Sequence, residues 1–150
     1  MTKRHQALIP LTHDHRHALV QARALIAASD SDPDTGTRVA KSFTSFYGND
    51  TLLHFHEEEE VLFPRLLEHL GEAPAVLTRV LVEHVRSHGM VAQLKDALTS
   101  GAPSGEQLRA LGETLRAHVR LEENDLFPLI ERAVPEEDLR AVGLAERSRN

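Results

Sequence analysis

A motif that occurs twice constrains the fold of this chain more than any other feature. Residues 54–64 read HFHEEEEVLFP, and residues 118–128 read HVRLEENDLFP. Each copy has a histidine, two glutamates four and five positions later, and the ending Leu-Phe-Pro. A weaker echo relates the Asp-His pair at 14–15 to the Glu-His pair at 83–84. The two halves of the chain therefore resemble each other, as expected for a helical bundle with an approximate two-fold axis.

Apolar side chains recur three and four positions apart along most of the chain, which predicts amphipathic helices and little strand. The polar segments 29–36 and 99–104 have the composition of loops. The order of elements predicts an all-α fold, an up-down-up-down four-helix bundle with a short C-terminal helix. The four long helices are expected at about 9–29, 37–70, 74–98 and 104–133, and the short one at 135–142, closing at Gly143.

Two prolines and one serine refine this picture. Pro64 and Pro128 lie inside the second and fourth predicted helices, where each removes a backbone hydrogen bond and is expected to kink its helix. Ser104 precedes Gln107 by three residues, the spacing of a capping box that starts the fourth helix.

Seven side chains with metal-ligand chemistry lie on the inward stripes of these helices. Residues four apart on a helix are rotated by only about 40°, so both present their side chains to one point. Taken alone, a histidine in a core is usually a hydrogen-bonded structural residue. A cluster is harder to explain without metal, because buried carboxylates without partners are costly and clustered imidazoles repel when protonated. The seven are His15, His54, Glu58, His84, His88, His118 and Glu122.

The donor atoms indicate which metals fit. The chain has no cysteine, so the ligands are nitrogen and oxygen atoms, which suit Fe, Mn, Zn or Cu. A structural zinc needs only four ligands, whereas seven ligands with two carboxylates that can bridge fit a pair of metals better. A histidine majority makes the pair less negative, which favours the diferrous state and small-molecule binding over strong oxygenase chemistry.

The other acids and histidines near these motifs are expected to point outward. Glu59 and Glu123 each lie about 140° around the helix from the motif histidine, towards solvent or a neighbouring helix edge. The acidic run 57–60 is expected to be mostly solvated, with only Glu58 directed inward. The five histidines expected at the surface are His5, His13, His17, His56 and His69.

Composition limits the remaining possibilities. A chain of 150 residues with 41% hydrophobic residues fits a single domain over 1–150, with a bundle core at about 8–133. The net charge of −6 argues against a nucleic-acid partner. No apolar run is long enough for a signal peptide or a membrane span. The absence of cysteine fits a reducing cytosol, so we expect a cytoplasmic protein that is a monomer or at most a weak homo-oligomer.

The ordered set of motifs resembles the haemerythrin-like (HHE cation-binding) domain family over roughly residues 8–131. The residues that carry the resemblance are the Asp-His pair at 14–15, the HxxxE motifs at 54–58 and 118–122, the HxxxH motif at 84–88 and the two Leu-Phe-Pro endings. The invertebrate oxygen carriers place an aspartate five residues after the last histidine, whereas this chain has Glu122 four residues after His118.

This resemblance implies two iron ions, bridged by an oxo or hydroxo group and by Glu58 and Glu122. One iron would be held by three histidines and the other by two, with an open position on the second iron for O2. The three are His84, His88 and His118, and the two are His15 and His54. Phe55, Leu115 and Val119, each close to a ligand in the sequence, are expected as apolar walls of the pocket.

Three functions remain open at this point. The chain would bind, store or sense O2, decompose hydrogen peroxide or handle nitric oxide as an enzyme, or store and deliver iron. A dry pocket favours the first function, and a polar residue beside the open position favours the second. Tyr47, the only tyrosine, lies two turns before His54 on the same stripe. It is either a core aromatic residue or a ligand or hydrogen-bond donor to the iron pair.

Overall fold

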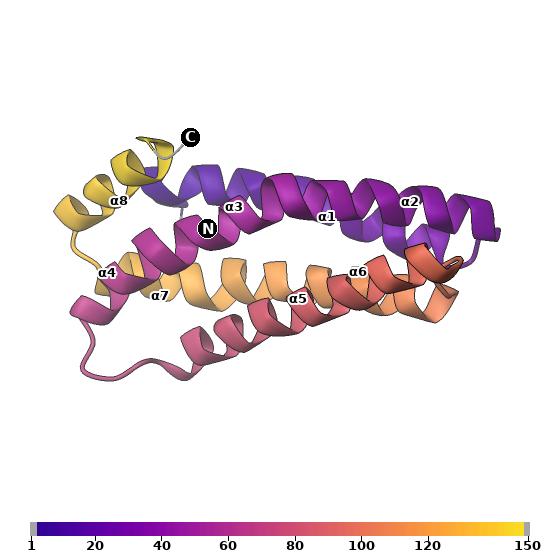
Figure 1. Ribbon diagram of the computed structural model, residues 1–150. Coiled ribbons are helices and arrows are strands. Elements are labelled where there is room, and N and C mark those ends of the chain that lie inside the picture. Colours follow the sequence, from indigo (N-terminus) through magenta and orange to yellow (C-terminus); the bar gives the residue numbers. More distant parts are fainter. Residues whose placement is uncertain (1–2, 149–150) are drawn as a thin grey trace.

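A computed structural model describes residues 3–148 of the chain, and Figure 1 shows its elements. Over these residues the chain forms four long helical rods and one shorter helix. The second and fourth rods are continuous but include turns of π-helix. In order, the elements are η1 (Gln6–Leu8), α1 (Ile9–Ala28), α2 (Pro33–Phe46), η2 (Tyr47–Thr51), α3 (Leu52–Glu57), η3 (Glu58–Leu62), α4 (Phe63–Glu68), α5 (Ala75–Ser100), α6 (Gly105–Leu121), η4 (Glu122–Leu126), α7 (Phe127–Ala133) and α8 (Glu136–Ser148).

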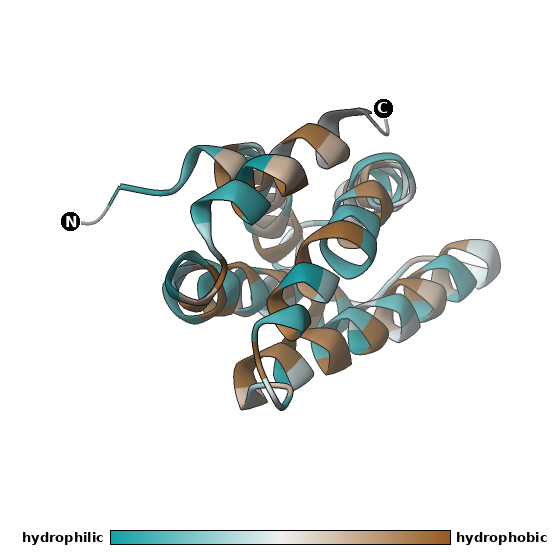
Figure 2. Ribbon diagram, turned by 90° about the vertical axis from the view of Figure 1, so that its left-hand side faces the viewer, coloured by the Kyte–Doolittle hydropathy of each residue, from teal (hydrophilic) through white to brown (hydrophobic). Residues whose placement is uncertain are grey.

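The four rods run alternately in opposite directions, so the predicted up-down-up-down bundle is confirmed. Helix α8 lies across the end of the bundle where α4 and α7 finish, at the left of Figure 1. Figure 2 looks at that end and shows hydrophobic and hydrophilic residues interleaved along the helices. Among the described residues, no helix is both long and apolar enough to cross a bilayer.

Two helix boundaries differ from the sequence prediction. Helix α2 begins at Pro33, inside the predicted loop, because Asp32 accepts a hydrogen bond from the Thr35 N–H at 2.9 Å and the proline suits the first turn. Helix α8 continues through Gly143 to Ser148. A Cβ at Gly143 would lie 3.3 Å from that of Ala7, so this glycine lets α8 pack closely and does not end the helix. The predicted cap at Ser104 is confirmed, with Gln107 N–H donating to its Oγ.

A turn of π-helix precedes each of the two internal prolines, Pro64 and Pro128, in the sequence. Phe63 N–H donates to the carbonyl of Glu58, and Phe127 N–H donates to that of Glu122, so both bonds span five residues. A proline has no N–H and crowds the carbonyl four residues before it, and the wider turn accommodates this defect. Each π turn begins at a candidate ligand, and its extra residue rotates the side chains that follow.

Two apolar clusters fill the bundle. One lies towards the α8 end and includes Leu11 and Phe127, and the other lies towards the α1–α2 connection and includes Leu25, Phe43 and Leu108. At the second cluster, a Cβ at Gly112 would come within 2.8 Å of the Ala22 carbonyl oxygen, so glycine permits α6 to approach α1 closely. Between the clusters lies a layer of buried polar side chains.

Candidate metal centre

Six of the seven candidate ligands meet in this polar layer, at the middle of the bundle. They come from all four rods and are between 0% and 7% exposed. The two glutamates lie at the centre, each at the start of a π turn. The six are His15, His54, Glu58, His84, His118 and Glu122.

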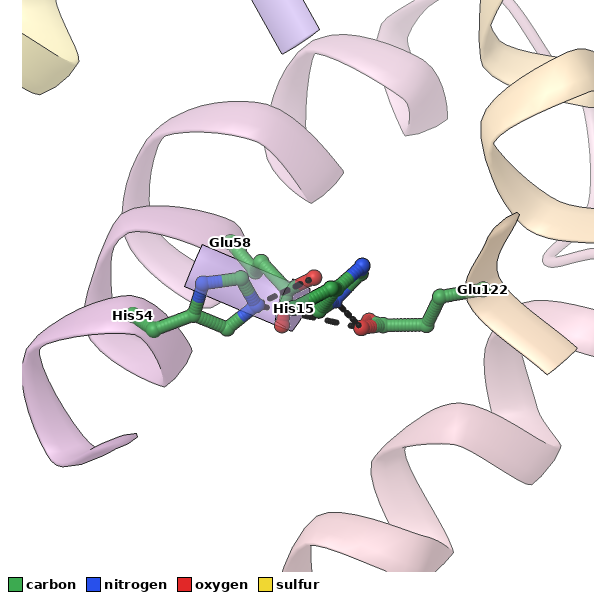
Figure 3. Close-up of side chains that lie close together, drawn as sticks. All are labelled: His15, His54, Glu58 and Glu122. Carbon is green, nitrogen blue, oxygen red and sulfur yellow. Dashed lines mark hydrogen bonds and ion pairs between the residues drawn. The ribbon is translucent and has the colours of Figure 1, made fainter. Parts of the chain in front are cut away.

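The first of two possible cation positions lies between α1 and the HxxxE motif of α3, and Figure 3 shows its side chains converging on one point. Its ligand atoms all lie within 4.8 Å of one another. His15 Nε2 is 2.9 Å from Glu122 Oε1, and His54 Nε2 is 3.4 Å from Glu58 Oε2. Two imidazoles and two carboxylates therefore surround this position.

The second position is built in the same way on the other side of the glutamates. His84 Nε2 lies 3.3 Å from Glu58 Oε1, and His118 Nε2 lies 3.4 Å from Glu122 Oε1. Glu58 and Glu122 belong to both groups. The arrangement therefore offers two neighbouring sites, each with two histidines of its own and both sharing two carboxylates that can bridge.

Each of the four histidines has a carboxylate on its other ring nitrogen. The Nδ1 atoms lie within 2.6 to 3.0 Å of a carboxylate oxygen. An Nδ1–H that donates to a carboxylate fixes the tautomer and leaves the Nε2 lone pair free for a metal. The pairs are His15 with Glu123, His54 with Asp14, His84 with Glu59 and His118 with Glu83.

The inner atoms of the cluster pass a direct test for cation binding. Six of them are buried and have no hydrogen-bond partner, although such atoms are nearly always satisfied in proteins. These six atoms belong to two carboxylates and three imidazole rings, and all six point into the same layer. One or two cations would satisfy them together. The six atoms are Nε2 of His54, His84 and His118, both carboxylate oxygens of Glu58, and Oε2 of Glu122.

The electrostatics of the cluster also call for positive charge. Burial alone would lower the pKa of His118, but the charge of Glu122 and the hydrogen bond to Glu83 outweigh it and raise the pKa to about 10. His15 and His54 likewise have raised pKa values, because nearby carboxylates overcome the effect of burial. Burial would raise the pKa of Glu122, yet His118 holds it well below its usual range. The carboxylates thus favour positive charge among them, from a cation or from protons on these histidines.

Glu59 and Glu123 face neighbouring helices, which is one of the two alternatives that their angle on the helix predicted. They reach the Nδ1 atoms of His84 and His15 on neighbouring rods, at 2.7 and 2.6 Å. Both residues lie within π turns, and the prediction did not include these contacts with the candidate ligands. Glu57 is also buried, at 2% exposure, so the acidic run is less solvated than expected. The repeated Glu-Glu pair was the signal in the sequence that could have identified these partners.

His88 is the one candidate ligand that the structure does not bring to the cluster. Its side chain is exposed on α5, and its Nδ1 forms a hydrogen bond with the hydroxyl of Tyr47. The ring of Phe55 stacks flat on His84 at 3.8 Å and makes an edge contact with His88 at 5.8 Å, so it contacts both histidines.

Tyr47 is a buried core residue whose hydroxyl is engaged away from the glutamates. It is 5% exposed and packs edge-on against Phe55 with ring centres 6.2 Å apart. Burial, together with the negative charge of Glu59, raises the pKa of the Tyr47 hydroxyl. A phenolate is therefore disfavoured at this place, and the hydroxyl is hydrogen-bonded to the ring of His88.

A pocket of about 290 Å³ opens beside the first position. His15 and His54 line it, together with His118 of the second position, and Phe55, Leu115 and Val119 contribute apolar lining. Asp50 and Thr51, both in the π turn η2, also line this pocket. Asp50 is exposed and Thr51 is buried.

Fold and site together define an α-helical bundle whose interior holds a histidine- and carboxylate-rich centre for cations. The sequence matches the hemerythrin HHE cation binding domain over residues 9–130, and the chain belongs to this family. No curated protein matches the chain. The family description names cations, and the buried groups of His and Glu supply a place for them.

Proposed function

We propose that the chain is a non-haem di-iron protein that binds O2 or a related small molecule, as a carrier, store or sensor. The observation that carries this proposal is the set of buried, unpaired Nε2 and carboxylate atoms that surround two positions with two shared glutamates. Nitrogen and oxygen donors without sulfur suit iron. A bound pair of iron ions would supply reversible redox chemistry and a coordination position for the ligand.

The ligand set proposed here has four histidines and two glutamates. His15 and His54 would hold one ion, His84 and His118 the other, and Glu58 and Glu122 both. His88 is left out because its ring is exposed and bonded to Tyr47. Each ion would then have two imidazoles and two carboxylate oxygens, which leaves room for bridging groups and for an exogenous ligand.

The surrounding residues favour binding over turnover. Leu115, Val119 and Phe55 present apolar surface to the first position and limit the access of water and protons. The hydroxyl of Tyr47 is engaged in a hydrogen bond with Nδ1 of His88, which disfavours its use as a proton donor at the cluster. The four carboxylates on the Nδ1 atoms hold the imidazoles in one orientation whether or not a small molecule is bound.

A second candidate is an enzyme that decomposes hydrogen peroxide or handles nitric oxide. The observation in its favour is that polar side chains line the pocket. Thr51 is buried and lines it together with Asp14 and Asp50. A hydroxyl and two carboxylates at the pocket could relay protons to a bound molecule. Thr51→Val separates the two candidates, because it slows turnover in an enzyme and leaves the stability of an O2 adduct unchanged or improved in a carrier.

Metal analysis of the purified protein, combined with visible spectra of the reduced form before and after O2, tests the main proposal. We expect two iron ions per chain and a new visible band that reverses when O2 is removed. One zinc ion per chain in a tetrahedral site would overturn the di-iron proposal. Two iron ions with rapid peroxide loss and no reversible band would favour the enzyme.

A further inference from the structure

Apart from His88, which is bonded to Tyr47, the histidines outside the metal centre fall into two groups. His5, His56 and His69 each have a carboxylate next to the ring, at 2.7, 3.7 and 2.7 Å. Such pairs are ordinary surface contacts. His13 and His17 are different: within residues 3–148, the only hydrogen-bond or ion-pair contact of either ring is with the other.

Both rings project from one face of α1, because their spacing of four residues places them one above the other. Both are exposed. Their Nε2 atoms face each other at 3.4 Å, and the ring centres are 4.9 Å apart at an angle of 85°. A hydrogen bond between them would be at the long end of the normal range, so it holds the pair only weakly.

The separation of the two nitrogens fits a shared metal ion better than a hydrogen bond. Two imidazoles bound to a tetrahedral ion at metal–nitrogen distances of 2.0–2.1 Å have nitrogens about 3.3–3.4 Å apart. His13 Nε2 and His17 Nε2 already have this separation. Two histidines four apart on one helix face are also a known way to bind a divalent ion.

The pair of His13 and His17 lies beside the pocket that leads to the candidate metal centre. His17 lines the pocket that leads to His15 and His54, and Asp14 and Asp50 line it as well. Carboxylates attract a divalent cation, and the net charge of −6 does so at longer range. An ion held by His13 and His17 would stand at the mouth of this pocket with water in its remaining coordination positions.

We propose that His13 and His17 form an outer capture site for one divalent transition-metal ion, such as Zn²⁺ or Fe²⁺. The site has two protein ligands and exposed surroundings, so it binds weakly and exchanges its ion with solvent. It is separate from the buried centre, shares no ligand with it, and does not require that the buried ions be iron.

A zinc titration followed by calorimetry tests this proposal on the full chain with its buried positions already loaded. The variants are His13→Asn, His17→Asn and the double variant, with His56→Asn as the matched control on another exposed helix face. We expect one weak Zn²⁺ site in the parent and in His56→Asn, and at least tenfold weaker binding in each single variant. Because a chelate needs both rings, the double variant should be no weaker than either single one.

Two results would overturn the capture site. The first is equal Zn²⁺ affinity in His17→Asn and His56→Asn, and the second is additive losses, which would show two independent surface histidines. Iron content and the visible spectrum are recorded in the same samples. A failure of the di-iron proposal therefore shows as a wrong buried metal, whereas a failure of the capture site shows only in the zinc titration.

Discussion

The two halves of the metal centre use the same ligands but have different surroundings. In each half, two histidines from neighbouring rods face the glutamates, and each has a carboxylate at Nδ1. The acid before one histidine contacts the histidine of the next rod, as Asp14 does for His54 and Glu83 does for His118. The internal repeat thus extends beyond the ligands to the groups that orient them.

The difference lies in the residue that follows each motif histidine. On the His84 side this residue is Phe55, whose ring stacks on His84 at 3.8 Å. On the His15 side the repeat places Val119 there, and the pocket opens beside it. Phe55 and Val119 both line this pocket, together with His15 and His54 of the first position and His118 of the second, but His84 lies outside its lining. The stacked ring of Phe55 therefore covers His84, whereas the pocket reaches both histidines of the first position, and we expect an incoming molecule to reach that position more readily.

The shared glutamates provide the largest test of this comparison. Glu122→Gln removes a carboxylate from both positions, so we expect the protein to lose both ions, as measured by metal content after desalting. Glu123→Gln weakens only the hydrogen bond to His15, and such outer partners typically change metal affinity by about 10- to 100-fold. Loss of a single ion in Glu122→Gln would show that the two halves do not share this ligand.

The next prediction distinguishes the ligand set with four histidines from the set with five. We expect His84→Ala to lose the ion of the closed half and His88→Ala to keep both ions, because only His84 has a buried Nε2 directed at Glu58. Metal analysis and the visible spectrum report both results. A loss of iron in His88→Ala as large as that in His84→Ala would restore the five-histidine set of the sequence prediction.

The sequence alone could predict the fold and most of the candidate ligands, but not every contact around them. Periodicity and the repeated motif were enough for the bundle, because both depend only on residue spacing. The angles of Glu59 and Glu123 left two alternatives, solvent or a neighbouring helix, and only the packing of the rods decides that each carboxylate reaches a histidine. His88 and Tyr47 could not be placed from spacing alone, since their pairing depends on where Phe55 packs between rods.

The metal-free protein offers a test in which both halves act together. His118 has a pKa of about 10, and His15 and His54 have pKa values raised above the usual histidine range. A histidine whose pKa is higher in the folded than in the unfolded protein stabilises the fold below about pH 6.5. That stabilisation is lost as the pH rises through the folded-state pKa. We therefore expect the melting temperature of the metal-free protein to fall between about pH 7 and 10.

The metal-loaded protein should not show this fall in melting temperature. Metal replaces the protons on Nε2, so its melting temperature should change little over that range, and ions should be released as pH falls and protons compete. The gap between loaded and metal-free melting temperatures then widens from pH 7 to 10. A constant gap would show that the histidines of the metal-free cluster are already neutral at pH 7.

The smallest effect concerns access and tests the difference between the halves directly. Val119→Phe places in the open half the aromatic ring that Phe55 places in the closed one. Overpacking a core typically costs about 1–3 kcal/mol, but the adjoining pocket of about 290 Å³ offers room for the ring. We expect both metals to stay bound and azide to bind at least about tenfold more weakly, a loss of about 1.4 kcal/mol.

Val119→Ile is the matched control, since it adds bulk without a ring and should bind azide nearly as the parent does. Equal azide affinity in Val119→Phe and Val119→Ile would mean that exogenous ligands reach the metals by another route, and the open half would lose its distinction.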